Sequence, residues 1–146
     1  MAIVNATNVL IKIHNDPDTG AASVVDSLLF STSANLTINR AMRDKTNKAS
    51  AGYSESLAGL ISWELSGDGF VDFTTSGTSK NTDELFDQMI LTGTTGVESE
   101  ITVKFTDGTN NYTGNAFITS LSIDAGVEEN ATYSVSIQGT GPLTST

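Results

Sequence analysis

The side chains that most often carry out chemistry are scarce in this chain. His14 is the single histidine, and the sequence has no cysteine. A serine, cysteine or zinc site therefore has one imidazole and no thiolate to draw on, and no carboxylate stands at a useful spacing from His14. No nucleophile-elbow sequence is present, and no pattern singles out a catalytic pair among the carboxylates. We interpret His14 as a solvated strand residue, and the sequence predicts no catalytic residue and no enzyme.

Two short segments have a superficial likeness to ligand-binding loops. Asp16 and Asp18 begin like a calcium loop, but the fifth position is Gly20 and no glutamate closes the loop, so a hairpin turn is favoured. The Gly-Asp-Gly segment at 67–69 lacks the spacing and the lysine of a phosphate loop, and it is predicted to be a turn or bulge. The sequence therefore predicts no metal site and no cofactor.

The length and composition favour a small β-rich domain. A chain of 146 residues corresponds to one ordinary domain, so 1–146 is predicted to fold as a single unit. Charged residues make up only 16% of the chain, whereas it has 21 threonines and 17 serines. Hydroxyl and β-branched side chains suit pleated strands and are poor in helix interiors. No apolar run approaches the length of a membrane span and no leader pattern is present, so we expect folding in the cytosol that makes the protein.

The net charge of −10 is unevenly distributed along the chain. Residues 40–48 hold four of the seven bases and one acid, while the rest of the chain is strongly acidic and should repel nucleic acid. The stretch 40–56 has no apolar period and is predicted to be a long polar loop, which is uncommon in a compact domain unless it is functional. Charge alone gives equal weight to a contact with the acidic face of a neighbouring copy and to a solvated, mobile loop.

Alternation of apolar and polar residues predicts the remaining elements. Strands are expected at 9–14, 24–30, 33–39, 60–66, 101–105, 112–123 and 132–138. One helix is expected at about 81–91, where acids occupy the first turn and apolar residues recur at helical spacing. The predicted fold class is therefore mainly β, a sandwich or small barrel with the helix covering one open end.

The order of segments along the chain carries a resemblance to a known family. The segments are Lys-Thr-Asn-Lys at 45–48, Gly-Tyr-Ser-Glu-Ser-Leu-Ala-Gly-Leu-Ile-Ser-Trp-Glu-Leu-Ser-Gly-Asp-Gly at 52–69, Asp-Glu-Leu-Phe at 83–86, Ile-Thr-Val-Lys-Phe at 101–105, and the stretches 112–122 and 133–141. In this order they resemble the major tail tube proteins of long-tailed bacteriophages, over roughly residues 30–143. These are packing and turn residues, so their order rather than any single motif carries the resemblance.

The resemblance implies a fold, an assembly and a set of partners. The fold would be a tail-tube-type β-sandwich or barrel of two antiparallel sheets, with one flanking α-helix at about 81–91. In that family six copies form a ring, and stacked rings make the conduit through which DNA is ejected. The implied partners are the chain itself, tape-measure, tail terminator and distal tail proteins, with DNA passing without specific binding and no membrane. The implied location is the tail tube of the virion, after assembly in the host bacterial cytoplasm.

The resemblance also assigns a role to the polar stretch at 40–56, because the family uses this loop for contacts between subunits or rings. The candidate contact residues carried over in this way are Arg40, Arg43, Asp44, Lys45, Lys48 and Tyr53. Each exposed ion pair would contribute about 0 to 1 kcal/mol, so its main effect would be on register.

A wall along which DNA slides should be weakly negative or rich in hydroxyl groups, because lysine and arginine would bind phosphate. The candidate lumen-facing residues are Thr102, Ser120, Ser122 and Ser134. Lys104 shares the face of Thr102 and fits such a wall poorly.

Two alternative functions stay open. One is the inner tube of a contractile tail or injection system, which neighbouring genes with or without a sheath would distinguish. The other is a monomeric carbohydrate-binding or adhesin β-sandwich, which would need an exposed aromatic patch. Trp63 instead shares a predicted core face with Ile61 and Leu65, which speaks against that second alternative.

Overall fold

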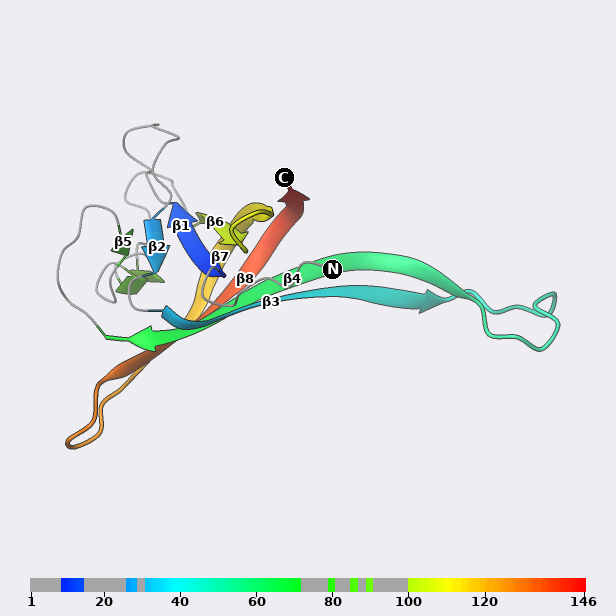
Figure 1. Ribbon diagram of the computed structural model, residues 1–146. Coiled ribbons are helices and arrows are strands. Elements are labelled where there is room, and N and C mark those ends of the chain that lie inside the picture. The colour runs from blue at the N-terminus through cyan, green and yellow to red at the C-terminus, as the bar shows by residue number, and fades with distance from the viewer. Residues whose placement is uncertain are drawn as a thin grey trace.

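The strands that the structure describes join into one hydrogen-bonded sheet. The computed structural model describes residues 9–14, 26–28, 31–71, 79–80, 85–86, 89–90 and 100–146. The strands within these residues are β1 (Leu10–His14), β2 (Asp26–Leu28), β3 (Ser31–Asp44), β4 (Ser56–Phe70), β5 (Ser79–Lys80), β6 (Ile101–Thr106), β7 (Asn111–Asp124) and β8 (Thr132–Ser145). Their order across the sheet is β3-β4-β8-β7-β6-β1-β2-β5 (Figure 1).

The mainly β prediction is confirmed. The six strands from β3 to β1 in sheet order pair antiparallel throughout, and two short strands extend the edge beyond β1. A division into two separate packed sheets is not seen among the described residues, because hydrogen bonding runs continuously from β3 to β5. Most of the helix predicted at about 81–91 lies outside the described residues, so that helix stays a prediction.

One face of the curled sheet forms the core. Ile11 and Ile13 of β1 belong to the same buried cluster as Trp63 and Leu65 of β4, and each is at most 2% exposed. Since β1 and β4 stand four places apart in the sheet order, the sheet must curl to bring their inner faces together. β1 also approaches β3, the strand at the far edge. The curl thus lets one sheet enclose its own core.

The Trp63 side chain ties β4 to β7 and β8. Its Nε1 donates a hydrogen bond to the carbonyl oxygen of Gly141 at 3.1 Å, and the Gln138 amide donates to the Trp63 carbonyl oxygen at 3.0 Å. The ring lies directly over Gly114 and Gly139, where a β-carbon would come within 2.5 Å and 2.1 Å of ring atoms. Glycine is required at both places because the indole occupies the space of their side chains.

Glycines misled the sequence analysis at two places. β8 was expected to end at 138, but it continues past Gly139 to Ser145. The turn predicted at 67–69 is wrong, because β4 runs through to Phe70 and keeps its pairing with β8 there. The alternative of a bulge agrees with the irregular pairing of Asp68 and Gly69 with Ser33 and Ser31 of β3. Gly67 and Gly69 are buried at inward positions of that strand. Glycine in this sheet often marks a close approach of the core side chains rather than a turn.

The contact between Trp63 and Gly139 predicts a large effect of a single methyl group. The change Gly139→Ala should lower the free energy of unfolding by about 1 to 3 kcal/mol, because the new β-carbon overlaps a rigid ring that has nowhere to move. Urea denaturation followed by circular dichroism measures this loss.

The same measurement in a Trp63→Leu background separates the clash from any change in strand propensity. Removal of the ring should make Gly139→Ala close to neutral. A cost of the same size in both backgrounds would contradict the packing explanation.

Candidate interface surfaces

The stretch predicted as a loop at 40–56 consists of the outer end of a β-ribbon and the connection between its two strands. β3 continues to Asp44 and β4 begins at Ser56, so the connection covers 45–55, and Arg40 pairs with Ile61. The two strands leave the body of the sheet together and reach far beyond it (Figure 1). The loop prediction was wrong for residues 40–44 because it relied on alternation of apolar and polar side chains. A ribbon that has no layer packed on either face needs no such alternation.

The tip of the ribbon, residues 45–55, is a shaped turn held by its own hydrogen bonds. The backbone amide of Lys45 donates to the carbonyl of Glu55 at 3.0 Å, and that of Tyr53 donates to Ser50 at 2.9 Å. The Ser50 hydroxyl accepts the amide of Asn47 at 3.1 Å, and Ser50 is only 7% exposed. The tip therefore presents its side chains on a defined backbone.

All six predicted contact residues lie on this ribbon. Arg40, Arg43 and Asp44 lie near the end of β3, and Lys45, Lys48 and Tyr53 lie in the tip. Lys45 and Glu55 form an exposed ion pair with 3.5 Å between Nζ and Oε2, a geometry that contributes little to stability. In the part of the chain that the structure describes, Arg40, Arg43 and Lys48 make no ion pair.

Asp44 has a role inside the tip. Its carboxylate accepts the backbone amide of Thr46 at 2.7 Å. Hydrogen bonds from the Thr46 side chain and then from its backbone lower the pKa of Asp44. The carboxylate therefore stays ionised at neutral pH and shapes the turn next to Lys45.

The ribbon also exposes large apolar side chains. Met42, Tyr53, Leu57 and Leu60 are 62%, 77%, 55% and 77% exposed. Apolar side chains gathered on a projecting element, with basic residues between them, are typical of a surface that another protein covers. Both properties make the ribbon a candidate interface.

A second surface lies on the outward face of β4, β7 and β8. Ser134 stands opposite Ser122 on one side and Asp68 on the other, and Ser120 stands opposite Ser136. The structure thus brings three of the predicted lumen-facing residues into one patch, which we call the hydroxyl patch and define as Asp68, Ser120, Ser122, Ser134 and Ser136. These side chains are exposed, and on β4 and β8 they alternate with buried neighbours.

Thr102, the fourth predicted lumen residue, has different surroundings. It lies on β6, where its hydroxyl donates to the Asn115 side-chain oxygen at 3.3 Å, and it pairs in register with His14. Lys104 lies two residues after Thr102 on the same face, and it pairs in register with Lys12. The surroundings of Thr102 therefore contain two bases and one acid, Glu100, whereas the hydroxyl patch contains a carboxylate and no base. Sequence reasoning could not see this because only the register places the two lysines side by side.

Asp68 determines the electrostatics of the hydroxyl patch. Its carboxylate accepts hydrogen bonds from the hydroxyl of Ser134 and, at 2.8 Å, from that of Ser33. These bonds, with Ser134 the larger contributor, hold the pKa of Asp68 below its usual value. On the inner side of the sheet, burial and the charge of Asp68 raise the pKa of Tyr133 to about 12. The patch thus keeps a fixed negative charge at neutral pH.

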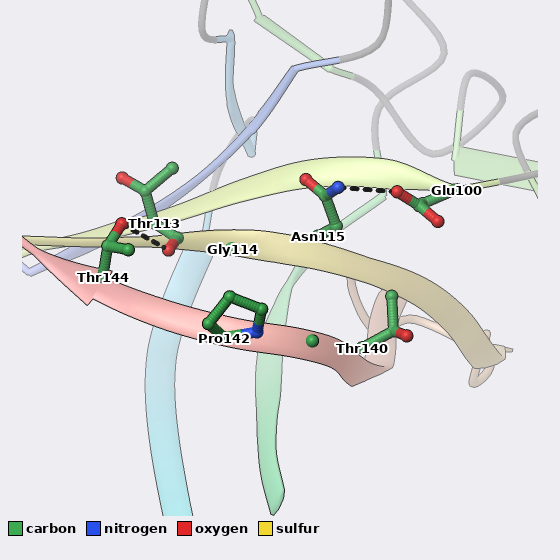
Figure 2. A pocket seen from close by; sticks show the side chains of 8 residues that line it. Glu100, Thr113, Gly114, Asn115, Thr140, Pro142 and Thr144 are labelled. Carbon is green, nitrogen blue, oxygen red and sulfur yellow. Dashed lines mark hydrogen bonds between the residues drawn. The ribbon is translucent and has the colours of Figure 1, made fainter.

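A small polar pocket opens between the ends of β7 and β8 (Figure 2). It holds about 390 Å³ and is lined by Glu100, Thr113, Gly114, Asn115, Thr140, Gly141, Pro142 and Thr144. Within it, the Asn115 amide donates to the Glu100 carboxylate at 2.6 Å, and the Thr144 hydroxyl donates to the Thr113 carbonyl at 3.1 Å. These polar groups bond to one another.

The described residues contain no group of three or more histidine, cysteine, aspartate or glutamate side chains placed to hold a metal ion. Within those same residues, none of the helical segments has the length and apolar character needed to cross a membrane.

An apolar groove at the base of the ribbon was missed by the sequence analysis. It holds about 570 Å³ and is lined by Ile38, Ile61, Trp63, Tyr112, Gly141, Pro142, Leu143 and Ser145. The alternation placed Ile38 and Ile61 on core-facing sides, yet they are 53% and 54% exposed. Ile38 stands two residues before Arg40, the first base of the cluster at 40–48, and Ile61 pairs with Arg40. The start of this basic cluster was the available sign that the body of the sheet ends near Ile38 and Ile61.

Comparison with protein families places nearly the whole chain in one of them. Residues 3–145 match the family described as phage tail tube protein. No curated protein matches the sequence. The family match agrees with the resemblance inferred from the order of segments.

Solved structures share the fold at low sequence identity. A chain in the tail of an empty gene transfer agent particle, determined with C6 symmetry, is 23% identical with a TM-score of 0.75, covering 97% of this chain and 98% of that one. The SPP1 tail tube gives a TM-score of 0.70 at 13% identity, covering 98% of this chain and 78% of that one. The baseplate of the anti-feeding prophage gives 0.55 at 11% identity, covering 94% and 91%.

The hydrogen bond between Ser134 and Asp68 predicts a measurable change in titration. The change Ser134→Ala should raise the pKa of Asp68 toward its ordinary value of 3.8, because the larger of two stabilising bonds to the carboxylate is lost. A carboxyl-carbon NMR titration measures this pKa.

Linkage gives the sign of the effect on stability. A lowered folded pKa adds stability above 3.8 that disappears as the pH falls through the folded value, so Ser134→Ala should lose more stability at neutral pH than in strong acid. Ser122→Ala is the matched control, since Ser122 neighbours Ser134 in register. An equal pKa shift in both variants would contradict the assignment.

Proposed function

The chain belongs to the phage tail tube protein family, and on that premise we propose that it assembles into stacked hexameric rings forming a conduit for DNA ejection. It is a structural protein of the virion tail tube, from a family of structural proteins rather than enzymes. The proposal includes the finer fold of two packed layers, which the two halves of the curled sheet would form, with a helix at about 81–91. Its further partners are tape-measure, tail terminator and distal tail proteins, with assembly in the host bacterial cytoplasm.

One observation carries the proposal of rings. The similarity to the gene transfer agent tail chain extends over 97% of this chain and 98% of that one, so the shared fold covers nearly all of both. That tail has C6 symmetry. A subunit of the same extent and shape supports the same arrangement of six copies here.

The exposed ribbon supports self-assembly through a separate argument. A monomer would leave Leu60 and Tyr53 in water, each 77% exposed, on an element with no packing partner of its own. Coverage by neighbouring copies would bury these side chains and shield the strand edges from uncontrolled pairing. The ribbon is therefore the proposed contact between subunits.

We assign the hydroxyl patch to the wall of the conduit. Ser120, Ser122 and Ser134 can hydrogen-bond to water, and the ionised Asp68 repels phosphate, so DNA would pass without being held. Thr102 stays a weaker candidate for that wall, because Lys12 and Lys104 lie beside it. The proposed wall therefore consists mainly of side chains on β7 and β8.

The similarity to the anti-feeding prophage baseplate favours a second candidate function. The same subunit could build the inner tube of a contractile tail or injection system, and a neighbouring sheath gene would distinguish this from a non-contractile tail. No observation favours the carbohydrate-binding or adhesin alternative, since Trp63 is 2% exposed and cannot form a sugar platform.

Electron microscopy of the purified chain tests the proposal directly. Six-fold rings or tubes with a bore wide enough for a DNA duplex are the expected particles. Light scattering over a range of concentrations gives the mass of the assembled species in parallel. A strict monomer at every concentration would count decisively against self-assembly.

The basic residues of the ribbon should matter for assembly more than for folding. Replacing Arg40, Arg43, Lys45 and Lys48 together by glutamine should weaken polymerisation by about tenfold or more, because charge complementarity sets the register of contacts. The free energy of unfolding should change little, since exposed substitutions usually stay within about 0.5 kcal/mol each.

Sedimentation measures the polymer fraction in this experiment, and urea denaturation measures stability. Lys12→Gln with Lys104→Gln is a matched control, because it removes bases from β1 and β6 of the body instead of from the ribbon. Equal losses of polymerisation and stability in the ribbon variant would remove the interface role.

A further inference from the structure

We propose that the apolar groove at the base of the ribbon receives the acidic β7–β8 loop, residues 125–131, of a second copy. The inference rests on the proposed self-assembly and specifies one of its contacts. It pairs the groove of one copy with a loop that stands at the end of the molecule away from the ribbon tip (Figure 1).

The groove is built to accept an apolar side chain. Ile38 and Ile61 are half-exposed on one face of the ribbon base, and Trp63 is buried beside them. Tyr112 of β7 and Leu143 of β8 line the same space, which holds about 570 Å³. Covering such a surface removes apolar area from water, which favours association.

The β7–β8 loop carries apolar side chains for such a groove. Val127 is 93% exposed, and Ile123, at the end of β7, is 50% exposed. Glu128 next to Val127 adopts a left-handed backbone with φ of 63°, which turns the chain there. The loop projects beyond the sheet at the end away from the ribbon tip (Figure 1). It therefore offers Val127 to another molecule.

Charges on the two surfaces are complementary. The loop carries Glu128 and Glu129, and Asp124 precedes the loop at the end of β7. Arg40 lies on the groove side of the ribbon, because it pairs with Ile61 and stands two residues after Ile38 on the same strand. A base at the rim of the groove and acids around the apolar side chain fix the orientation of the contact.

The contact must form between copies. Phe70 lies nine positions after Ile61 on β4, and it pairs with Thr132 at the start of β8. At about 3.3 Å per residue the loop lies about 30 Å or more from the groove of its own chain. Each copy has one groove and one loop, so the contact is heterologous and can repeat along the stacking direction.

Cysteine cross-linking tests this contact without background, because the chain has no cysteine of its own. The double variant Ile61→Cys with Val127→Cys should give a ladder of covalent multimers under mild oxidation, since each chain would join two neighbours. Each single variant should give dimers at most. Ser62→Cys with Val127→Cys is the matched control, because Ser62 is the next residue of β4 and alternates to the other side.

The outcomes separate this inference from the proposed function. Tubes of the unmodified chain without an Ile61–Val127 ladder, or with an equal ladder from the Ser62 control, would overturn the docking and leave tube assembly standing. A chain that never assembles would overturn both.

Charge exchange gives a second test that does not depend on cysteine variants folding well. Arg40→Glu alone and Glu128→Lys alone should each raise the concentration needed for polymerisation by about tenfold, because like charges then meet. The two changes in one chain should restore polymerisation toward that of the unmodified protein. No restoration would overturn the pairing of these two surfaces.

Discussion

The packing of the Trp63 ring against two glycines, one on β7 and one on β8, is the constraint on which the rest of the structure depends. The ring fills the space above Gly114 and Gly139, and its Nε1 donates to Gly141, so β4 is held at one position against β7 and β8. A shift of one residue would bring a β-carbon or the opposite face of a strand beneath the indole. The same ring lines the apolar groove. Trp63 therefore both fixes the packing of the core and forms part of the candidate docking surface.

β4 runs first through the exposed ribbon and then through the body of the sheet. From Trp63 onward β4 alternates buried and exposed residues, whereas from Ser56 to Ser62 nearly every residue is exposed. The change falls near the irregular pairing between Arg40 and Met42, where a β-carbon on Gly59 would come within 2.9 Å of the Ala41 carbonyl oxygen. A bulge at this point changes the twist where the ribbon leaves the body. The ribbon continues the sheet, so its direction is determined by the core.

Sequence patterns predicted those parts of the fold that obey the alternation rule. β1, β6 and the first half of β8 have one buried face, and their positions were predicted correctly. The ribbon was missed because neither of its faces is buried, and the end of β8 was missed because Gly139 resembles a turn residue. The register places Ser120, Ser122 and Ser134 in one patch, and their position in a lumen stays a prediction. The lysines beside Thr102 depend on register between distant strands, which composition and periodicity do not contain.

Charge and apolar area have different roles in the proposed assembly. A chain with net charge −10 repels its own copies, and that repulsion is weakest when the basic ribbon of one copy faces acidic residues of another. Exposed ion pairs contribute about 0 to 1 kcal/mol each and are screened by salt, so they cannot hold a tube together by themselves. The apolar side chains of the ribbon and groove would provide the affinity. The charges would then select, among the ways of burying those side chains, the one in which copies point in the same direction.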